Sequence, residues 1–175
     1  MAKKKGKKKN SNLNLITVFI AVVFGLASTA MIFASAFKGV AAFDLGIVQG
    51  SNEISFSGLQ AAFGYAETKE AWGSTITTEI LSANFFSLMA YALPIISAVV
   101  LILFKDTKLF NYICAGGFIA SAVFAFLSVT TFPGTIVLEF YTAYDYTLGV
   151  GSILCGAFSL IAGLATLYKI IVLDK

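Results

Sequence analysis

Four long stretches of the chain contain no Asp, Glu or Lys and are dominated by apolar side chains. They cover residues 15–37, 80–104, 109–138 and 146–168. A helix that crosses a membrane needs about 20 predominantly apolar residues. In the third stretch, Pro133 and Gly134 are expected to end the helix at Phe132. The pattern therefore predicts transmembrane helices over residues 15–37, 80–104, 109–132 and 146–168.

The polar segments between these stretches complete the predicted organisation. Residues 1–14 form a basic tail, and two short polar segments cover residues 105–108 and 169–175. The longer connections, residues 38–79 and 133–145, contain patterns typical of strands. Together these features predict a membrane protein of the all-α class, a four-helix transmembrane bundle with a small extracellular antiparallel β-sheet built from both outer loops.

The first apolar stretch has an alternative interpretation. A lysine-rich start, an apolar run and the sequence Ala34-Ser35-Ala36 resemble a secretory signal peptide with its cleavage site. The run is longer than the apolar region of an ordinary signal peptide, which favours a permanent helix. Cleavage would leave three crossings and would not change the rest of the topology.

The composition agrees with a membrane protein and excludes other classes. Of the 175 residues, 58% are hydrophobic and only 12% are charged. A soluble fold of this size could not bury so much apolar surface. The chain is therefore not a disordered protein, a disulfide-stapled secreted miniprotein or an ordinary soluble enzyme.

The distribution of lysines predicts the orientation. With both termini in the cytoplasm, ten of the twelve lysines lie on the inner side, and only Lys38 and Lys69 lie outside. Inner loops carry the excess of basic residues in multi-pass proteins. We therefore expect a plasma-membrane protein with cytoplasmic N- and C-termini.

The basic tail is expected to rest on the anionic lipids of the inner leaflet. A lysine near such a surface contributes roughly 1 kcal/mol. Nucleic-acid binding is the alternative, but the tail has no arginine or interleaved aromatic residue and directly precedes an apolar stretch. We therefore predict lipid partners and no nucleic acid. The lysines concerned are Lys3, Lys4, Lys5, Lys7, Lys8 and Lys9.

The first outer loop is predicted to contain three strands. Residues 40–48 are apolar, residues 49–52 are typical of a turn, and residues 53–57 alternate between polar and apolar side chains. Residues 58–65 are expected to continue as a third strand. Residues 66–73, which contain Trp72, are expected to form a loop or a short helix at the headgroup level.

The second outer loop is predicted to add a strand to the same sheet. Residues 135–141 are rich in β-branched and aromatic side chains. The alternative is that Tyr141, Tyr144 and Tyr146 only form an aromatic belt at the membrane surface. Five aromatic residues of the two loops are candidates for contacts with partners, and the outer apolar residues are expected to divide between the sheet core and a contact surface. The candidates are Phe56, Phe63, Trp72, Phe140 and Tyr141.

This arrangement resembles that of claudin-type tetraspan proteins. The shared features are four helices, a long first outer loop, a short second one and an outer sheet built from both. The family signature has Gly-Leu-Trp and two cysteines in the first loop, whereas here Gln60 follows Gly58-Leu59 and the loop has no cysteine. The resemblance implies a non-enzymatic protein that associates laterally or between cells through its outer face.

Each predicted helix carries a stripe of small residues, which lets membrane helices approach closely. The stripes contain Gly25 and Ser28 in the first helix, and Ser87, Ala90, Pro94 and Ser97 in the second. Those of the third and fourth helices are predicted packing sites, and the fourth is also a candidate for an oligomer contact. They comprise Gly117, Ser121 and Ala125, and Ser152, Gly156, Ser159 and Gly163. Pro94 is expected to kink its helix.

The sequence offers little catalytic chemistry. Without histidine there is no imidazole base and no histidine metal ligand, and Cys114 and Cys155 are expected at different membrane depths as free thiols. No Asp, Glu or Lys lies within a predicted helix, which disfavours an ion pathway. We therefore expect no enzyme activity, cofactor or metal.

The sequence favours a structural or interaction protein whose partner is a second copy or another membrane protein. Two alternatives remain open at this point. One is an accessory subunit of a transporter or channel, and the other is a lipid-handling protein with a groove between its helices.

Overall fold

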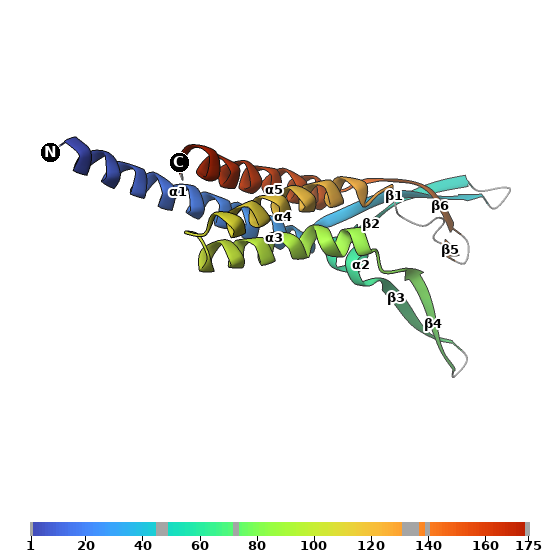
Figure 1. The fold of residues 1–175 in the computed structure, drawn as a ribbon. Coiled ribbons are helices and arrows are strands. Elements are labelled where there is room, and N and C mark those ends of the chain that lie inside the picture. Colours follow the sequence, from blue (N-terminus) through green and yellow to red (C-terminus); the bar gives the residue numbers. More distant parts are fainter. Residues whose placement is uncertain (1, 45–48, 72–73, 131–136, 139–140, 174–175) are drawn as a thin grey trace.

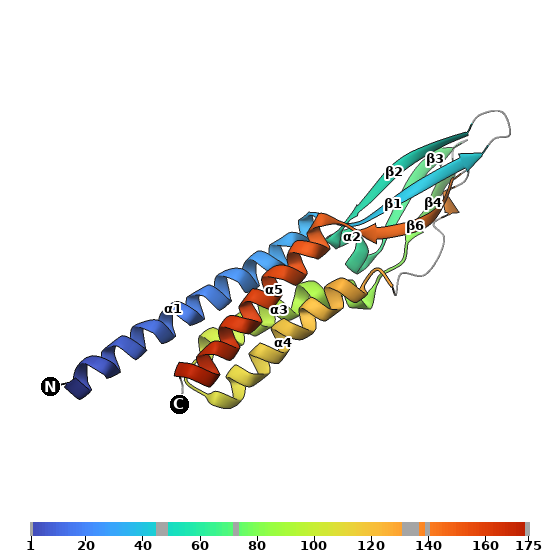
Figure 2. The ribbon, with the colours of Figure 1, turned by 90° about the horizontal axis from the view of Figure 1, so that it is seen from above.

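Four long helices and a group of strands make up the computed structural model, which describes residues 2–44, 49–71, 74–130, 137–138 and 141–173. In these residues four helices are long and apolar enough to cross a membrane. They run side by side as a bundle (Figures 1 and 2), and the predicted bundle of four apolar helices is thereby confirmed. The helices are α1 (Ala2–Ala30), α3 (Phe85–Leu103), α4 (Lys108–Leu127) and α5 (Val150–Tyr168).

Both termini lie at one end of the bundle and the strands lie at the other (Figures 1 and 2). The start of α1, which carries the lysines of the basic tail, extends beyond the ends of the other helices. α1 has 29 residues and α3 only 19, a difference of about 15 Å at 1.5 Å per residue. The lysine-rich end and the strands are therefore at opposite ends of the molecule.

A four-stranded antiparallel sheet forms the larger part of the strand end. Strands β1 (Ser35–Asp44) and β2 (Gln49–Ser57) lie between α1 and α3 in sequence. Strands β5 (Val137–Leu138) and β6 (Tyr141–Leu148) lie between α4 and α5. The order β2-β1-β6-β5 makes β1 the bridge between the two segments. Strands from both segments thus share one sheet, as predicted.

Glycine in β1 fits the packing of this sheet. Gly39 is paired with Ile54 of β2 on one side and with Tyr146 of β6 on the other. Ile54 and Tyr146 both pack against a small core formed by Phe56 and Leu81. With no side chain at position 39, the two large side chains that flank it have room on this face of the sheet.

A second, two-stranded sheet projects away from the first one (Figure 1). It consists of β3 (Tyr65–Ala71) and β4 (Ser74–Leu81), and the side chains of Thr68 and Thr77 are 3.3 Å apart across it. Leu81, at the end of β4, packs against Phe56 of the larger sheet. The hairpin is therefore tied to the larger sheet at its base.

The predicted third strand, residues 58–65, is wrong. Residues Gly58–Phe63 form a short helix, α2, which begins with a capping box. The Ser57 hydroxyl accepts a hydrogen bond from the Gln60 amide at 3.3 Å, and the Gln60 side chain accepts one from the Ser57 amide at 2.9 Å. These bonds satisfy backbone donors that a helix start leaves open, and they favour helix over strand.

The strands also extend further than predicted. In the first predicted stretch, α1 ends at Ala30 and is followed by a short 3₁₀ helix, Met31–Phe33. β1 then begins at Ser35. At the fourth stretch β6 continues to Leu148 before α5 begins at Val150. Residues 66–71, expected as a loop or short helix, belong to β3. The predicted stretches were bounded by charged residues. Within an uncharged apolar stretch, the sequence pattern does not show where a helix ends and a strand begins.

Close packing of the first turn of α5 against the start of β1 leads to a testable prediction. A Cβ atom added at Gly151 would lie 2.8 Å from the carbonyl oxygen of Ser35, whereas one added at Gly116 would meet nothing within 4 Å. We expect Gly151→Ala to lower the stability by about 1–3 kcal/mol, because backbone must move. Gly116→Ala is the matched control in α4.

Thermal unfolding of the two variants in detergent measures the difference. The expected result is a lower Tm for Gly151→Ala and an unchanged or slightly higher Tm for Gly116→Ala, since alanine is the better helix former. Equal Tm values for both variants would contradict the close contact of α5 with β1.

Candidate functional site

A proline in α3 leaves one backbone carbonyl inside the bundle without its helical hydrogen-bond donor. Pro94 has no backbone N–H, so the carbonyl of Ala90, four residues earlier, lacks its helical donor. The Ser121 hydroxyl of α4 donates to this carbonyl at 2.7 Å, and the Cys155 thiol of α5 approaches it at 3.5 Å. Two neighbouring helices therefore supply the donors that α3 itself cannot provide.

The same serine continues into a chain of hydroxyls across the bundle. Ser121 is 2.9 Å from Ser159 of α5, and Ser159 is 2.7 Å from Ser28 of α1. Ser28 donates to the carbonyl of Cys155 at 2.9 Å. All three serines are fully buried. This serine chain, Ser28, Ser159 and Ser121, together with the Ala90 carbonyl links all four long helices.

The donors of the serine chain are fully used within the bundle. A serine hydroxyl has one proton to donate. Ser28 and Ser121 give theirs to backbone carbonyls, so Ser159 donates its single proton to one of these two neighbours. No hydroxyl proton of the serine chain is left for a bound substrate. The arrangement is suited to holding helices together.

Two further sets of polar contacts tie the helices at other levels. Toward the strands, the Thr29 hydroxyl donates to the Tyr91 carbonyl at 3.1 Å, and the Tyr91 hydroxyl is 3.4 Å from Ser152. At the end near the termini, the buried ammonium of Lys169 donates to the Lys105 carbonyl at 2.7 Å. These contacts join α1 to α3, α3 to α5, and α5 to the turn after α3.

The predicted packing residues of α4 and α5 face the interior of the bundle. A Cβ at Gly117 would meet the Ser97 hydroxyl, one at Gly156 would lie 2.7 Å from the Phe126 ring, and one at Gly163 would lie 3.0 Å from Ile119. The remaining predicted packing residues are buried: Ser121, Ala125, Ser152 and Ser159. The stripe of α5 is thus covered by α1, α3 and α4 within one molecule.

The outer-loop candidates are in different environments. Phe56 is 4% exposed and belongs to the core between the two sheets, whereas Phe63 is 63% exposed on α2. Tyr141 is the first residue of β6. Trp72 and Phe140 lie outside the described residues. Phe56 is therefore a core residue, and Phe63 is the candidate that presents a large apolar surface.

The structure shows little that resembles a catalytic or metal centre. The described residues contain no group of three acidic, cysteine or histidine side chains that could hold a metal ion. Cys114 and Cys155 are both free and buried. A hollow of about 90 Å³ lies at the end near the termini, and its lining comprises Asn14, Leu15, Val18, Lys105 and Asp106.

No protein-family model matches the chain, and neither does any curated protein. The sequence and the structure are therefore the basis for the proposals below.

The serine chain leads to a prediction that a double-mutant cycle can test. Ser121→Ala removes the main donor to the carbonyl that Pro94 leaves open, and we expect it to cost about 1–2 kcal/mol of stability. Pro94→Ala restores an N–H that can bond the same carbonyl. In the Pro94→Ala background, Ser121→Ala should therefore cost clearly less.

Equilibrium unfolding of the wild type, both single variants and the double variant in mixed micelles gives the coupling energy. A cost of Ser121→Ala that is smaller in the Pro94→Ala background than in the wild type supports the assignment of Ser121 to the Ala90 carbonyl. Equal costs of Ser121→Ala in both backgrounds would mean that the hydroxyl does not replace the missing helical hydrogen bond.

Proposed function

We propose that this is a non-enzymatic integral membrane protein with a structural or interaction role. Its strand end associates with a second copy of the chain, either laterally or between cells. The resemblance to claudin-type tetraspan proteins is in line with this proposal. The proposed location is the plasma membrane, with both termini in the cytoplasm and the strands outside.

The observation that carries the proposal is the open edge of the larger sheet. β2 is nine residues long and pairs with β1 on one side, and no strand of the described chain pairs with its other side. An edge strand presents a row of backbone donors and acceptors that can pair with another chain. Backbone hydrogen bonding at β2 therefore offers a direct route to association.

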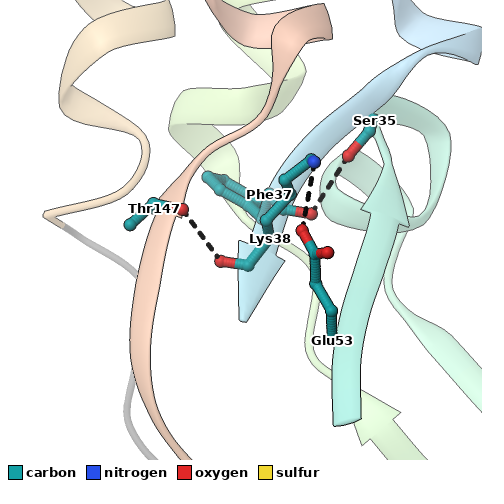
Figure 3. A network of polar contacts seen from close by, with 5 residues as sticks. All are labelled: Ser35, Phe37, Lys38, Glu53 and Thr147. Carbon is teal, nitrogen blue, oxygen red and sulfur yellow. Dashed lines mark hydrogen bonds and ion pairs between the residues drawn. The ribbon is translucent and has the colours of Figure 1, made fainter. Parts of the chain in front are cut away.

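The edge lacks the features that commonly prevent such pairing. β2 contains no proline and no lysine, and its only charged residue is Glu53. Glu53 forms an ion pair with Lys38 of β1 at 3.0 Å (Figure 3). Because this pair neutralises the one charge on β2, charge repulsion between two β2 edges is reduced.

A second copy is the simplest partner for this edge. Two identical edges can pair antiparallel about a two-fold axis, and each then supplies the donors and acceptors that the other needs. The interior of the bundle supports the same conclusion, because the serine chain is saturated within one molecule. The unpaired backbone edge of β2 is therefore the proposed contact with the second copy.

The basic tail has a separate role in the proposal. The first turns of α1 carry six lysines and lie at the end opposite the strands. In the proposed orientation they face the anionic inner leaflet, where each contributes roughly 1 kcal/mol to binding. The tail thus helps to set the orientation that leaves β2 outside.

Cysteine cross-linking in native membranes tests the proposed association. Ser55 of β2 is exposed, and so is Thr107 in the turn between α3 and α4 at the opposite end. In a background with Cys114→Ala and Cys155→Ser, we expect Ser55→Cys to give a cross-linked dimer with a flexible bis-maleimide. Thr107→Cys is the matched control and should give little or none.

Mass analysis of the cross-linked band distinguishes the outcomes. A band of twice the chain mass from Ser55→Cys supports self-association through β2. Exclusive cross-linking to one larger transport protein would instead favour an accessory subunit. A Ser55→Cys variant that remains monomeric in membranes, although the thiol reacts with a monofunctional maleimide, would contradict the proposal.

A further inference from the structure

The short helix α2 presents an apolar face on its exposed side. Leu59 and Phe63, four residues apart and therefore on the same face, are 40% and 63% exposed. Gly58, Ala61 and Ala62 are buried on the opposite side. A surface helix in water normally has the reverse pattern, with polar side chains outward. The exposed face of α2 therefore requires an apolar environment.

α2 is fixed in this orientation by its backbone. The Gly58 amide donates to the Ala34 carbonyl at 3.0 Å, and the Asn84 amide donates to the Ala61 carbonyl at 3.0 Å. A Cβ atom at Gly58 would lie 2.8 Å from the backbone of Ile32. Because both ends of α2 are bonded to neighbouring segments, the helix cannot turn to bury its exposed face.

Further apolar side chains are exposed at the same level of the molecule. Phe33 precedes Ala34 and is 76% exposed, and Phe85 follows Asn84 and is 63% exposed. Because Ala34 and Asn84 are hydrogen-bonded to α2, the neighbouring Phe33 and Phe85 lie at the same level as α2 along the long axis of the bundle. Tyr65, just after α2, is also exposed. We call Phe33, Leu59, Phe63, Tyr65 and Phe85 the junction patch.

The described charged residues at this end of the molecule lie on the strand side of the junction patch. Lys38 and Glu53 form their ion pair on β1 and β2, with 42% and 64% of their side chains exposed (Figure 3). Lys38 follows directly after the buried Phe37. The polarity of the surface therefore changes from apolar to charged within a few residues of the patch.

The lengths of the helices place this change at the boundary of a bilayer. α3 has 19 residues, which corresponds to about 28 Å at 1.5 Å per residue. The hydrocarbon core of a bilayer is about 30 Å thick. With the helices crossing this core, α2 lies at the level where hydrocarbon meets headgroups. Aromatic side chains are enriched at this level in membrane proteins.

We propose that the junction patch inserts into the interfacial layer of the leaflet on the strand side. Its occupant is lipid because the patch continues the exposed apolar surface of the long helices without an intervening charge. Rigid attachment of α2 to the starts of β1 and α3 transmits this contact to the strands. Lipid contact at α2 thereby fixes the orientation of the larger sheet relative to the membrane surface.

Site-specific tryptophan fluorescence tests this proposal. Trp72 is the only tryptophan, so Trp72→Phe gives a background without one. In that background we compare Phe63→Trp with Thr77→Trp on the hairpin and Phe19→Trp on α1, whose native side chains are all exposed. The proteins are reconstituted in phosphatidylcholine vesicles that contain lipids brominated near the headgroup end of the acyl chain.

The expected result is that bromolipid quenches Phe63→Trp strongly and that acrylamide quenches it weakly. Thr77→Trp should show the opposite, and Phe19→Trp serves as the reference for lipid contact. Phe85→Trp provides a second reporter in the same patch and should behave like Phe63→Trp. The emission maximum of both patch variants should be shifted to the blue relative to Thr77→Trp.

Two results would overturn the proposal. Quenching of Phe63→Trp and Phe85→Trp by acrylamide alone would place the patch in water. Protection of both from acrylamide and from bromolipid would show that another protein surface covers the patch. Neither result depends on whether β2 pairs with a second copy, so the test is independent of the proposed association.

Discussion

The absence of water around a membrane helix is the constraint on which the rest of this structure depends. In hydrocarbon an unsatisfied backbone group has no solvent partner, so the carbonyl that Pro94 exposes must find a donor inside the protein. Ser121 provides that donor, and the contacts of Ser121 with Ser159 and of Ser159 with Ser28 bring in the two remaining long helices. One local defect in α3 is thereby connected to polar contacts that reach all four long helices.

The apolar helices could be predicted from sequence because the thickness of a bilayer sets the length of the uncharged stretch that a spanning helix needs. The partners within the bundle could not. The open carbonyl can be assigned to Ala90 because this residue lies four positions before Pro94. Nothing in the sequence, however, shows that Ser121 rather than another small residue donates to this carbonyl. The burial of Lys169 also escaped prediction, because its partner is the backbone carbonyl of Lys105, which carries no side-chain signal.

The errors at the strand end have a common physical origin. The Ser57 and Gln60 spacing is a capping-box signal that identifies the start of α2, yet the alternating pattern just before it favoured a continued strand. β3 was missed because its sequence lacks the alternation of polar and apolar side chains that burial of one face imposes. The sheet was predictable in outline because β-branched and aromatic residues cluster in both connections, whereas register depends on pairings between distant segments.

In the proposed topology, the lysine-rich start of α1 and the strands lie on opposite sides of one membrane. Labelling with a membrane-impermeant maleimide in sealed cells measures this directly, with single thiols introduced by Lys5→Cys and Thr77→Cys in a background without native thiols. We expect Thr77→Cys to be labelled in intact cells and Lys5→Cys to be labelled only after permeabilisation. Labelling of both thiols in intact cells, or of Lys5→Cys alone, would contradict the proposed topology.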